Sequence, residues 1–231
     1  MTTTTDPDAQ AALDRLRAAT VLHGFPEGGA DVLARFVGAV LAESERVNLT
    51  GSKTLADAID VLATDAVPVA AAWDPDRSPP RVAIDLGTGN GLPGAAVAVR
   101  WPSCVVVLVE RRAKKARAVD RCLAAAGVRN AVLVACDGRE LLRHRPDLAR
   151  GADLVTVRAV GELAPTTKEA SPWVAPGGRV VHWKPAALEP AEREAGLVAA
   201  RTAGLRPLPD VEFSPGGRSG ERRLVLYERP R

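Results

Sequence analysis

Apolar side chains recur every three or four positions in the first part of the chain. Leu13 and Leu16 belong to one such stripe, and Leu33 and Phe36 belong to a second. This period is typical of amphipathic helices. We therefore expect a helical N-terminal extension over residues 1–80, with helices at 8–23, 30–46 and 55–72.

Beyond Arg81 the pattern changes to short apolar runs that alternate with helical stretches. The run 104–110 is almost continuously apolar, as expected for a strand that is buried on both faces of a sheet. This alternation predicts an α/β fold, with a mostly parallel sheet and helices on both sides. The expected strands are 81–86, 104–110, 131–135, 153–157 and 179–183, and the expected helices are 92–100, 113–126, 162–173 and 185–203.

The C-terminal part differs, because two strand-like stretches follow each other with no helix between them. Residues 205–213 and 222–228 are separated by a loop that contains Ser214-Pro215-Gly216-Gly217, a sequence suited to a hairpin. We expect an antiparallel end to the sheet, which gives seven strands, mostly parallel, with the last one antiparallel. Residues 81–231 then form the main domain, and the extension packs on it as one compact unit.

Composition narrows the class of protein. The chain has 231 residues, of which 46% are hydrophobic, so a sizeable core can form. No apolar run is long enough to span a bilayer, and the polar start at residues 1–9 lacks the features of a signal peptide. We therefore expect a cytoplasmic protein without a membrane partner. The net charge of +3 permits a nucleic-acid partner without requiring one.

Cysteines and histidines are few and scattered. No C-x-x-C pair occurs, so the sequence indicates neither a disulfide scaffold nor a zinc cluster, and we expect no metal. The residues concerned are Cys104, Cys122, Cys136, His23, His144 and His182.

The strongest chemical signal lies between the first expected strand and the helix after it. The sequence from Ile84 to Gly94 is I-D-L-G-T-G-N-G-L-P-G. Glycines permit positive φ angles and a close approach of the backbone to a ligand, and ligands of open α/β sheets bind at the carboxyl ends of the strands. The turn therefore predicts a nucleoside-binding site, with contacts at Gly87, Thr88, Gly89 and Gly91.

Part of the same turn matches G-x-G-x-x-G, the fingerprint of dinucleotide-binding folds. Glu110 would then bind the ribose of NAD. Two features favour S-adenosylmethionine (AdoMet) as the cofactor: Asp85 precedes the first glycine by two residues, and the antiparallel end of the sheet suits methyltransferases better than dehydrogenases. A nicotinamide oxidoreductase is the alternative.

Acidic residues stand at or near the ends of three expected strands. AdoMet presents hydrogen-bond donors on its amino group, its ribose and its adenine. We assign Asp85 to the amino group, Glu110 to the two ribose hydroxyls and Asp137 to the adenine amine. The alternative for each is a surface acid that caps the next helix.

The segment 84–94 resembles the cofactor motif of the bacterial 16S ribosomal RNA guanine-N7 methyltransferases, the glucose-inhibited-division protein B family. Further segments resemble the same family in the same order, from about residue 45 to residue 227. They are E-R-V-N-L-T at 45–50, Asp65, V-R-A-V at 157–160, Trp183-Lys184 and S-G-E-R-R-L-V at 219–225.

The resemblance implies a class I (Rossmann-like) methyltransferase that uses AdoMet to methylate N7 of a guanine in 16S ribosomal RNA of the small ribosomal subunit. It also implies cofactor contacts at Gly87, Leu92, Gly138, Arg139 and Arg158. We expect Arg158 and Lys184 to be catalytic, because both follow strands at the cofactor edge, and we expect a monomer. The residues expected at the substrate are Asn48, Thr50, Asp65, Pro93, Lys184, Arg222 and Arg223.

Some positions depart from the family pattern, and others are compatible with two different roles. Leu62 and Ala66 stand where the family usually has His and Ser on either side of Asp65. These departures leave open a methyltransferase of the same fold that acts on a protein or a small molecule, or a non-catalytic AdoMet-binding factor of ribosome assembly. Asn48 and Thr50 are equally suited to cap the third helix.

Overall fold

The structure is a computed structural model that describes residues 6–215 and 220–231. Three sequence-based expectations fall partly outside this range. They concern Gly216-Gly217 in the C-terminal loop, Ser219 at the start of the family-like ending, and the first five residues of the polar N-terminus.

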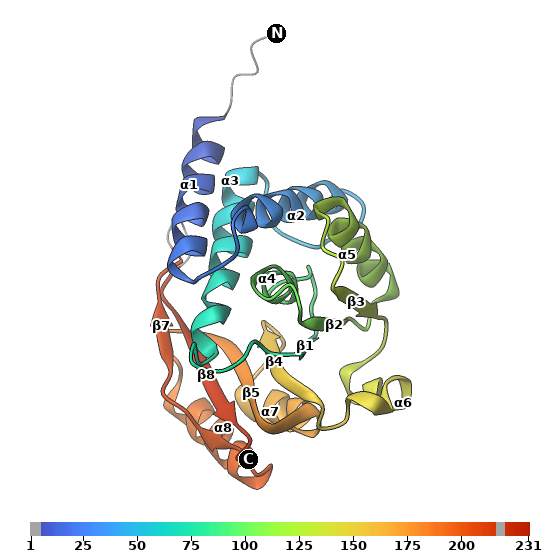
Figure 1. Ribbon diagram of the computed structural model, residues 1–231, viewed down its shortest axis with the longest axis vertical. Helices are drawn as coiled ribbons and strands as arrows, with labels where there is room; N and C mark the ends of the chain where they lie inside the picture. The colour runs from blue at the N-terminus through green and yellow to red at the C-terminus, as the bar shows by residue number, and fades with distance from the viewer. Residues whose placement is uncertain (1–5, 216–219) are drawn as a thin grey trace.

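Within the described residues, eight strands form one sheet in the order β3-β2-β1-β4-β5-β8-β6, and β7 also pairs with β8 (Figure 1). The first five strands pair with one another in parallel fashion, and β8 is antiparallel to β5. The expected mostly parallel sheet with an antiparallel last strand is thus confirmed. The strands are β1 (Val82–Leu86), β2 (Val105–Val109), β3 (Ala131–Val134), β4 (Ala152–Arg158), β5 (Val174–Pro185), β6 (Arg206–Pro207), β7 (Val211–Phe213) and β8 (Arg222–Glu228).

The expected count of seven strands is wrong by one. The segment 205–213 forms two short strands, β6 and β7, and both pair with β8 in antiparallel fashion. Pro207 and Pro209 explain the division, because a proline has no N–H with which to continue a ladder of hydrogen bonds.

Helices cover both faces of the sheet (Figure 1). One face carries the N-terminal helices together with α4 and α5, and α2 packs directly on both. This side contains α1 (Pro7–Leu22), α2 (Gly29–Glu43), α3 (Leu55–Ala58), η1 (Ile59–Thr64), η2 (Val67–Ala72), α4 (Gly94–Arg100) and α5 (Ala113–Ala126). The other side contains η3 (Gly138–Glu140), α6 (Leu141–His144), η4 (Pro146–Leu148), α7 (Leu163–Ala170), η5 (Ser171–Trp173) and α8 (Pro190–Thr202).

The third expected helix, 55–72, is not one regular helix. A single α-helical turn, α3, is followed by the π-helix η1 and then by the 3-10 helix η2. Pro68 cannot donate a backbone hydrogen bond, which favours a break in the regular pattern. The carbonyl groups of Val61 and Leu62 in η1 accept hydrogen bonds from the Arg158 guanidinium, at 3.3 and 3.2 Å.

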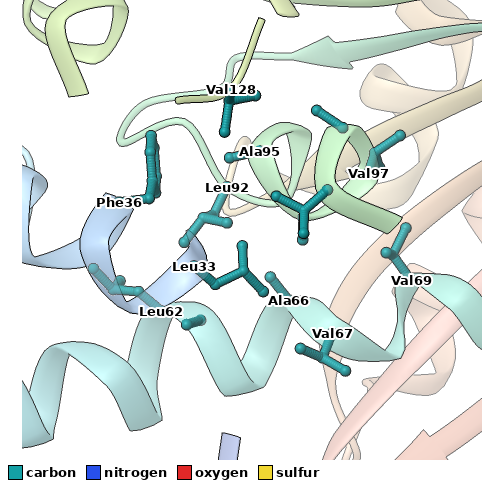
Figure 2. Close-up of a cluster of buried hydrophobic side chains, with 14 of the residues drawn as sticks. Leu33, Phe36, Leu62, Ala66, Val67, Val69, Leu92, Ala95, Val97 and Val128 are labelled. Carbon is teal, nitrogen blue, oxygen red and sulfur yellow. The ribbon is translucent and has the colours of Figure 1, made fainter. Parts of the chain in front are cut away.

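Leu62 and Ala66 lie in an apolar cluster between the N-terminal helices and α4 (Figure 2). Both are buried, and Leu33, Phe36 and Leu92 belong to the same cluster. A His or Ser at these positions would bring a polar group into apolar surroundings, which is unfavourable unless a hydrogen-bond partner accompanies it. The two departures from the family pattern are therefore core positions in this chain.

His182 on β5 is buried beneath α7. Its ring nitrogens lie 3.4 Å from Thr166 Oγ1 and 3.1 Å from Thr167 Oγ1, and its ring and that of Tyr227 pack in a T-shaped arrangement. Burial, together with the nearby charge of Lys184, lowers the pKa of His182 to about 3. The imidazole is therefore neutral near pH 7 and is held as part of the core.

This lowered pKa predicts a loss of stability in mild acid. Below about pH 6.5 the unfolded chain binds a proton at His182 that the folded chain excludes, so stability falls as the pH drops from about 6.5 toward 3. The limiting slope of about 1.4 kcal/mol per pH unit gives about 2 kcal/mol between pH 6.5 and pH 5. Urea unfolding at both pH values, for the wild type and His182→Phe, measures it. Equal losses in the two proteins would contradict the assignment, and His144→Phe is the exposed control.

Candidate cofactor site

The glycine turn carries the chain from β1 to α4, at the carboxyl edge of the sheet. Gly87 and Gly91 have φ angles of +67° and +92°. A Cβ atom on Gly87 would lie 2.7 Å from Val160 Cγ2, and one on Gly91 would lie 2.6 Å from the Phe36 ring. Only glycine therefore fits these two positions, for conformational and steric reasons together.

Asp85 stabilises this turn through hydrogen bonds. Its carboxylate accepts hydrogen bonds from Thr88 Oγ1 (2.5 Å), from Thr156 Oγ1 (2.7 Å) and from the backbone N–H of Gly94 (3.0 Å). Burial raises the pKa of Asp85, and these three donors work against that rise. All three donors belong to the protein, so Asp85 lies under the turn and outside the lining of the cavity described below.

Glu110 directly follows β2. Its carboxylate accepts the backbone N–H of Gly89 at 3.1 Å and that of Arg112 at 2.8 Å. The two hydrogen bonds fix the carboxylate against the glycine turn, and the residue is only 7% exposed. A pre-oriented carboxylate of this kind is suited to accept hydrogen bonds from a pair of hydroxyl groups.

A cavity of about 750 Å³ opens at the carboxyl ends of β1, β2, β3 and β4. Five residues predicted to bind the cofactor line it, namely Gly87, Glu110, Asp137, Gly138 and Arg139. The other lining residues are Val109, Arg111, Arg112, Lys115, Cys136, Ala159, Val160, Pro165, Lys168 and Glu169.

The remaining residues of the turn make hydrogen bonds or packing contacts within the protein. Thr88 donates to Asp85, and the N–H of Gly89 donates to Glu110. Leu92 is buried in the apolar cluster, and Pro93 immediately precedes α4 and is also buried. Their predicted contacts with the cofactor or the substrate stay predictions.

Asp137 and Arg139 form a pair at the edge of the cavity. The guanidinium of Arg139 donates to both carboxylate oxygens of Asp137, at 2.8 and 2.9 Å, and its backbone N–H donates to one of them at 3.1 Å. These bonds lower the pKa of Asp137 to about 2. Asp137 is also the N-cap of η3. This helix-capping role is the alternative that the sequence left open for Asp137.

Arg158, Asp65 and Arg222 come together on the face that carries the N-terminal helices. The Asp65 carboxylate lies 3.1 Å from Arg158 Nη1 and 3.3 Å from Arg222 Nε. Trp183 Nε1 donates to the backbone carbonyl of Asp65 at 3.0 Å. Burial lowers the pKa of Arg158, and the neighbouring carboxylates of Asp65 and Asp85 oppose that change. Arg158 does not line the cavity.

Lys184 points to the opposite face of the sheet, because adjacent residues of a strand alternate in direction. Its Nζ lies 2.5 Å from Glu192 Oε1 and 2.5 Å from the carbonyl oxygen of Gly161. Arg223, the β8 partner of Lys184, pairs with Asp210 and Glu212. Arg158 and Lys184 therefore do not share one face.

Asn48 and Thr50 lie in the loop between α2 and α3. Asn48 is exposed, and Thr50 Oγ1 accepts the backbone N–H of Ser52 at 3.1 Å. The side chain that caps α3 is Thr54, which accepts the N–H of Asp57 at 3.2 Å. Capping of the third helix by Asn48 or Thr50 is therefore wrong.

Sequence reasoning missed several residues of the cavity. Val160 packs against Gly87, and Lys168 and Glu169 reach the cavity from α7. Lys168 and Glu169 belong to an ordinary amphipathic helix, so no local signal separates them from surface positions. Val160 ends the family-like segment V-R-A-V at 157–160, which was the signal available for it.

The site fits AdoMet. The cavity has room for a nucleoside with a side chain, and the glycine turn lets the backbone approach a ligand closely. Glu110 offers a fixed carboxylate for the ribose diol. In the described parts of the chain, no group of three or more His, Cys, Asp or Glu side chains could hold a metal ion. Over the same residues, no helix has the length and apolar character to cross a membrane.

The fold and the site define an AdoMet-dependent methyltransferase of class I. In a comparison with solved structures, geranyl diphosphate methyltransferase in complex with GPP and sinefungin has the same fold. Its TM-score is 0.58 at 16% identity, over 75% of this chain and 80% of that chain. The chain belongs to the family described as rRNA small subunit methyltransferase G, whose family model matches residues 30–201.

Two curated relatives carry the name ribosomal RNA small subunit methyltransferase G. The protein of Roseiflexus castenholzii is 30% identical over 74% of this chain and 71% of its own length. The protein of Gloeobacter violaceus is 34% identical over 65% of this chain and 59% of its own length. This family is the one that the sequence motifs resemble.

Proposed function

We propose that the protein transfers a methyl group from AdoMet to N7 of a guanine in 16S ribosomal RNA of the small ribosomal subunit. The family and the names of the relatives support the RNA substrate. The motif resemblance supports the guanine N7 position. We further propose that the enzyme acts in the cytoplasm as a monomer, with the helical extension, residues 1–80, packed on the methyltransferase domain, residues 81–231.

The observation that carries this proposal is the basic rim of the cofactor cavity. Five cationic side chains line the cavity against three acidic ones. Within the described part of the chain, no acidic side chain forms an ion pair with Arg111, Arg112 or Lys115. Arg121, farther along α5, does form an ion pair, with Glu43. Unpaired cations at the mouth of a site attract the phosphates of a nucleic acid. The five cations are Arg111, Arg112, Lys115, Arg139 and Lys168, and the three acids are Glu110, Asp137 and Glu169.

The chemistry requires little of the protein beyond placement. Guanine N7 is a lone-pair acceptor, so its methylation removes no proton from that atom and needs no general base. His182 is neutral and buried, which is compatible with this requirement. When bound, AdoMet supplies the electrophilic methyl group. The protein then has to align the guanine and exclude water.

We propose that Arg158 and Lys184 act through the loop 159–161. Arg158 is anchored to η1 and Asp65 immediately before the loop, and Lys184 holds the carbonyl of Gly161 at its end. Ala159 and Val160 between them line the cavity. The two residues predicted to be catalytic thus fix the two ends of one cavity-lining segment from opposite faces of the sheet, and both are positioning residues.

The test is methyl transfer from labelled AdoMet to small ribosomal subunits that lack guanine-N7 methylation, with mapping of the product. We expect N7-methylguanine at one position of the 16S RNA, and a steep loss of rate with added salt. The double variant Arg111→Glu/Arg112→Glu should lose most of the transfer, and AdoMet binding measured on the same variant separates a loss of RNA contact from a loss of the cofactor. Label that appears only in protein or in small molecules would overturn the RNA substrate, and would favour the alternative that Leu62 and Ala66 leave open.

A further inference from the structure

Glu169 is an acidic side chain in the cofactor cavity with no assigned task. It lies in the last turn of α7 and is half-buried. Over residues 6–215 and 220–231, its carboxylate makes no hydrogen bond and no ion pair. Its Oε1 lies so close to Gly138 that a Cβ atom there would clash with it. The carboxylate therefore occupies space that only a glycine leaves free.

Asp137, the acid first assigned to the adenine amine, is in a different situation. Both of its carboxylate oxygens are engaged by the Arg139 guanidinium, and one of them also accepts a backbone N–H. Because those bonds lower the pKa of Asp137 to about 2, the carboxylate is already well stabilised. A further donor would gain less from Asp137 than from a carboxylate without partners.

The strand order indicates where the purine lies. The strands β3, β2 and β1 lie side by side in the sheet. At their carboxyl ends, Gly138 follows β3, Glu110 follows β2 and the glycine turn follows β1. With the ribose on Glu110 and the amino-acid part at the glycine turn, the purine falls beside Gly138. Glu169 borders the cavity at that position.

We propose that Glu169 accepts a hydrogen bond from the adenine amino group and selects adenine over a 6-oxo purine. A 6-oxo purine carries an oxygen in place of the amino group. Both this oxygen and the carboxylate are hydrogen-bond acceptors, so no hydrogen bond forms between them. Gly138 is needed in this arrangement because any larger residue displaces the carboxylate.

The electrostatics of the cavity agree with this role. Burial raises the pKa of Glu169, the negative charge of Asp137 raises it further, and the positive charge of Arg139 opposes part of that rise. A donor from the ligand stabilises the ionised form and lowers that pKa again. Binding and ionisation of Glu169 therefore favour each other, so cofactor affinity declines as the pH falls through the pKa of Glu169.

The experiment is calorimetric binding of S-adenosylhomocysteine and of its deaminated analogue S-inosylhomocysteine, with no RNA present. The outcome is thus independent of the proposed RNA substrate. We expect the wild type to prefer the adenine ligand by about tenfold or more. Glu169→Ala should abolish that preference, mainly through weaker adenine binding, and Gly138→Ala should reduce it. Asp137→Asn should lower both affinities by a similar factor and keep their ratio.

Glu162→Ala is the matched control, since this exposed acid immediately precedes the same helix and does not line the cavity. It should leave both affinities unchanged. Unaltered circular dichroism and melting temperature establish that each variant folds. A preserved adenine preference in Glu169→Ala overturns the proposal, as does a preference lost in Asp137→Asn alone.

Discussion

Glu110→Ala is expected to weaken AdoMet binding by about 100-fold or more. Two hydrogen bonds between a carboxylate and ribose hydroxyls contribute about 1.5–3 kcal/mol each, and each 1.4 kcal/mol corresponds to a factor of ten in affinity. The variant also leaves the N–H groups of Gly89 and Arg112 without their acceptor. The glycine turn then loses a fixed contact, which adds to the loss. Isothermal titration calorimetry measures the effect.

Two further variants make this result specific. Glu110→Gln keeps one side-chain oxygen as an acceptor but loses the charge, so we expect an intermediate loss of about tenfold. Glu140→Gln changes an exposed acid that lies near the cavity without lining it, and should have no effect. If Glu110→Ala bound AdoMet within threefold of the wild type, the ribose assignment would be wrong.

The fold, and the meeting of several predicted site residues at one cavity, could be predicted because their signals are local. Strands and helices follow from the spacing of apolar residues. The glycine turn and Glu110 each directly follow a strand, and the ends of parallel strands meet at one edge. The number of strands was missed because the apolar residues of 205–213 were weighed without Pro207 and Pro209, which interrupt the ladder of hydrogen bonds.

The direction of individual side chains could not be predicted, because it depends on partners far away in the sequence. Asp85 is tied to Thr156 on a different strand, and Arg158 is tied to Asp65 in the helical extension. The sequence shows that Trp183 and Lys184 alternate, but not which face each of them takes. The roles of Asp85 and Lys184 were therefore assigned from position along the chain alone.

Asp65→Ala is expected to lower the free energy of unfolding by about 3–5 kcal/mol, the usual cost of removing one partner from a buried ion pair. The Asp65 side chain is 6% exposed and that of Arg158 is 14% exposed, whereas that of Arg222 is 36% exposed. Water can replace much of the interaction that Arg222 loses with the Asp65 carboxylate. Most of the lost stability therefore comes from the buried guanidinium of Arg158, which is left without its carboxylate partner. The hydrogen bond from Trp183 goes to the backbone of Asp65 and persists in the variant. Urea unfolding measures the change.

A double-mutant cycle separates the charge from the packing. Arg158→Met removes the cation that Asp65→Ala leaves unpaired, so the double variant should be more stable than Asp65→Ala alone. Arg158 also donates to the carbonyl groups of Val61 and Leu62 in η1. If Asp65→Ala cost less than about 1 kcal/mol, those two carbonyls would be enough to hold the guanidinium. Arg158 would then fix the start of the loop 159–161 through the π-helix rather than through the ion pair.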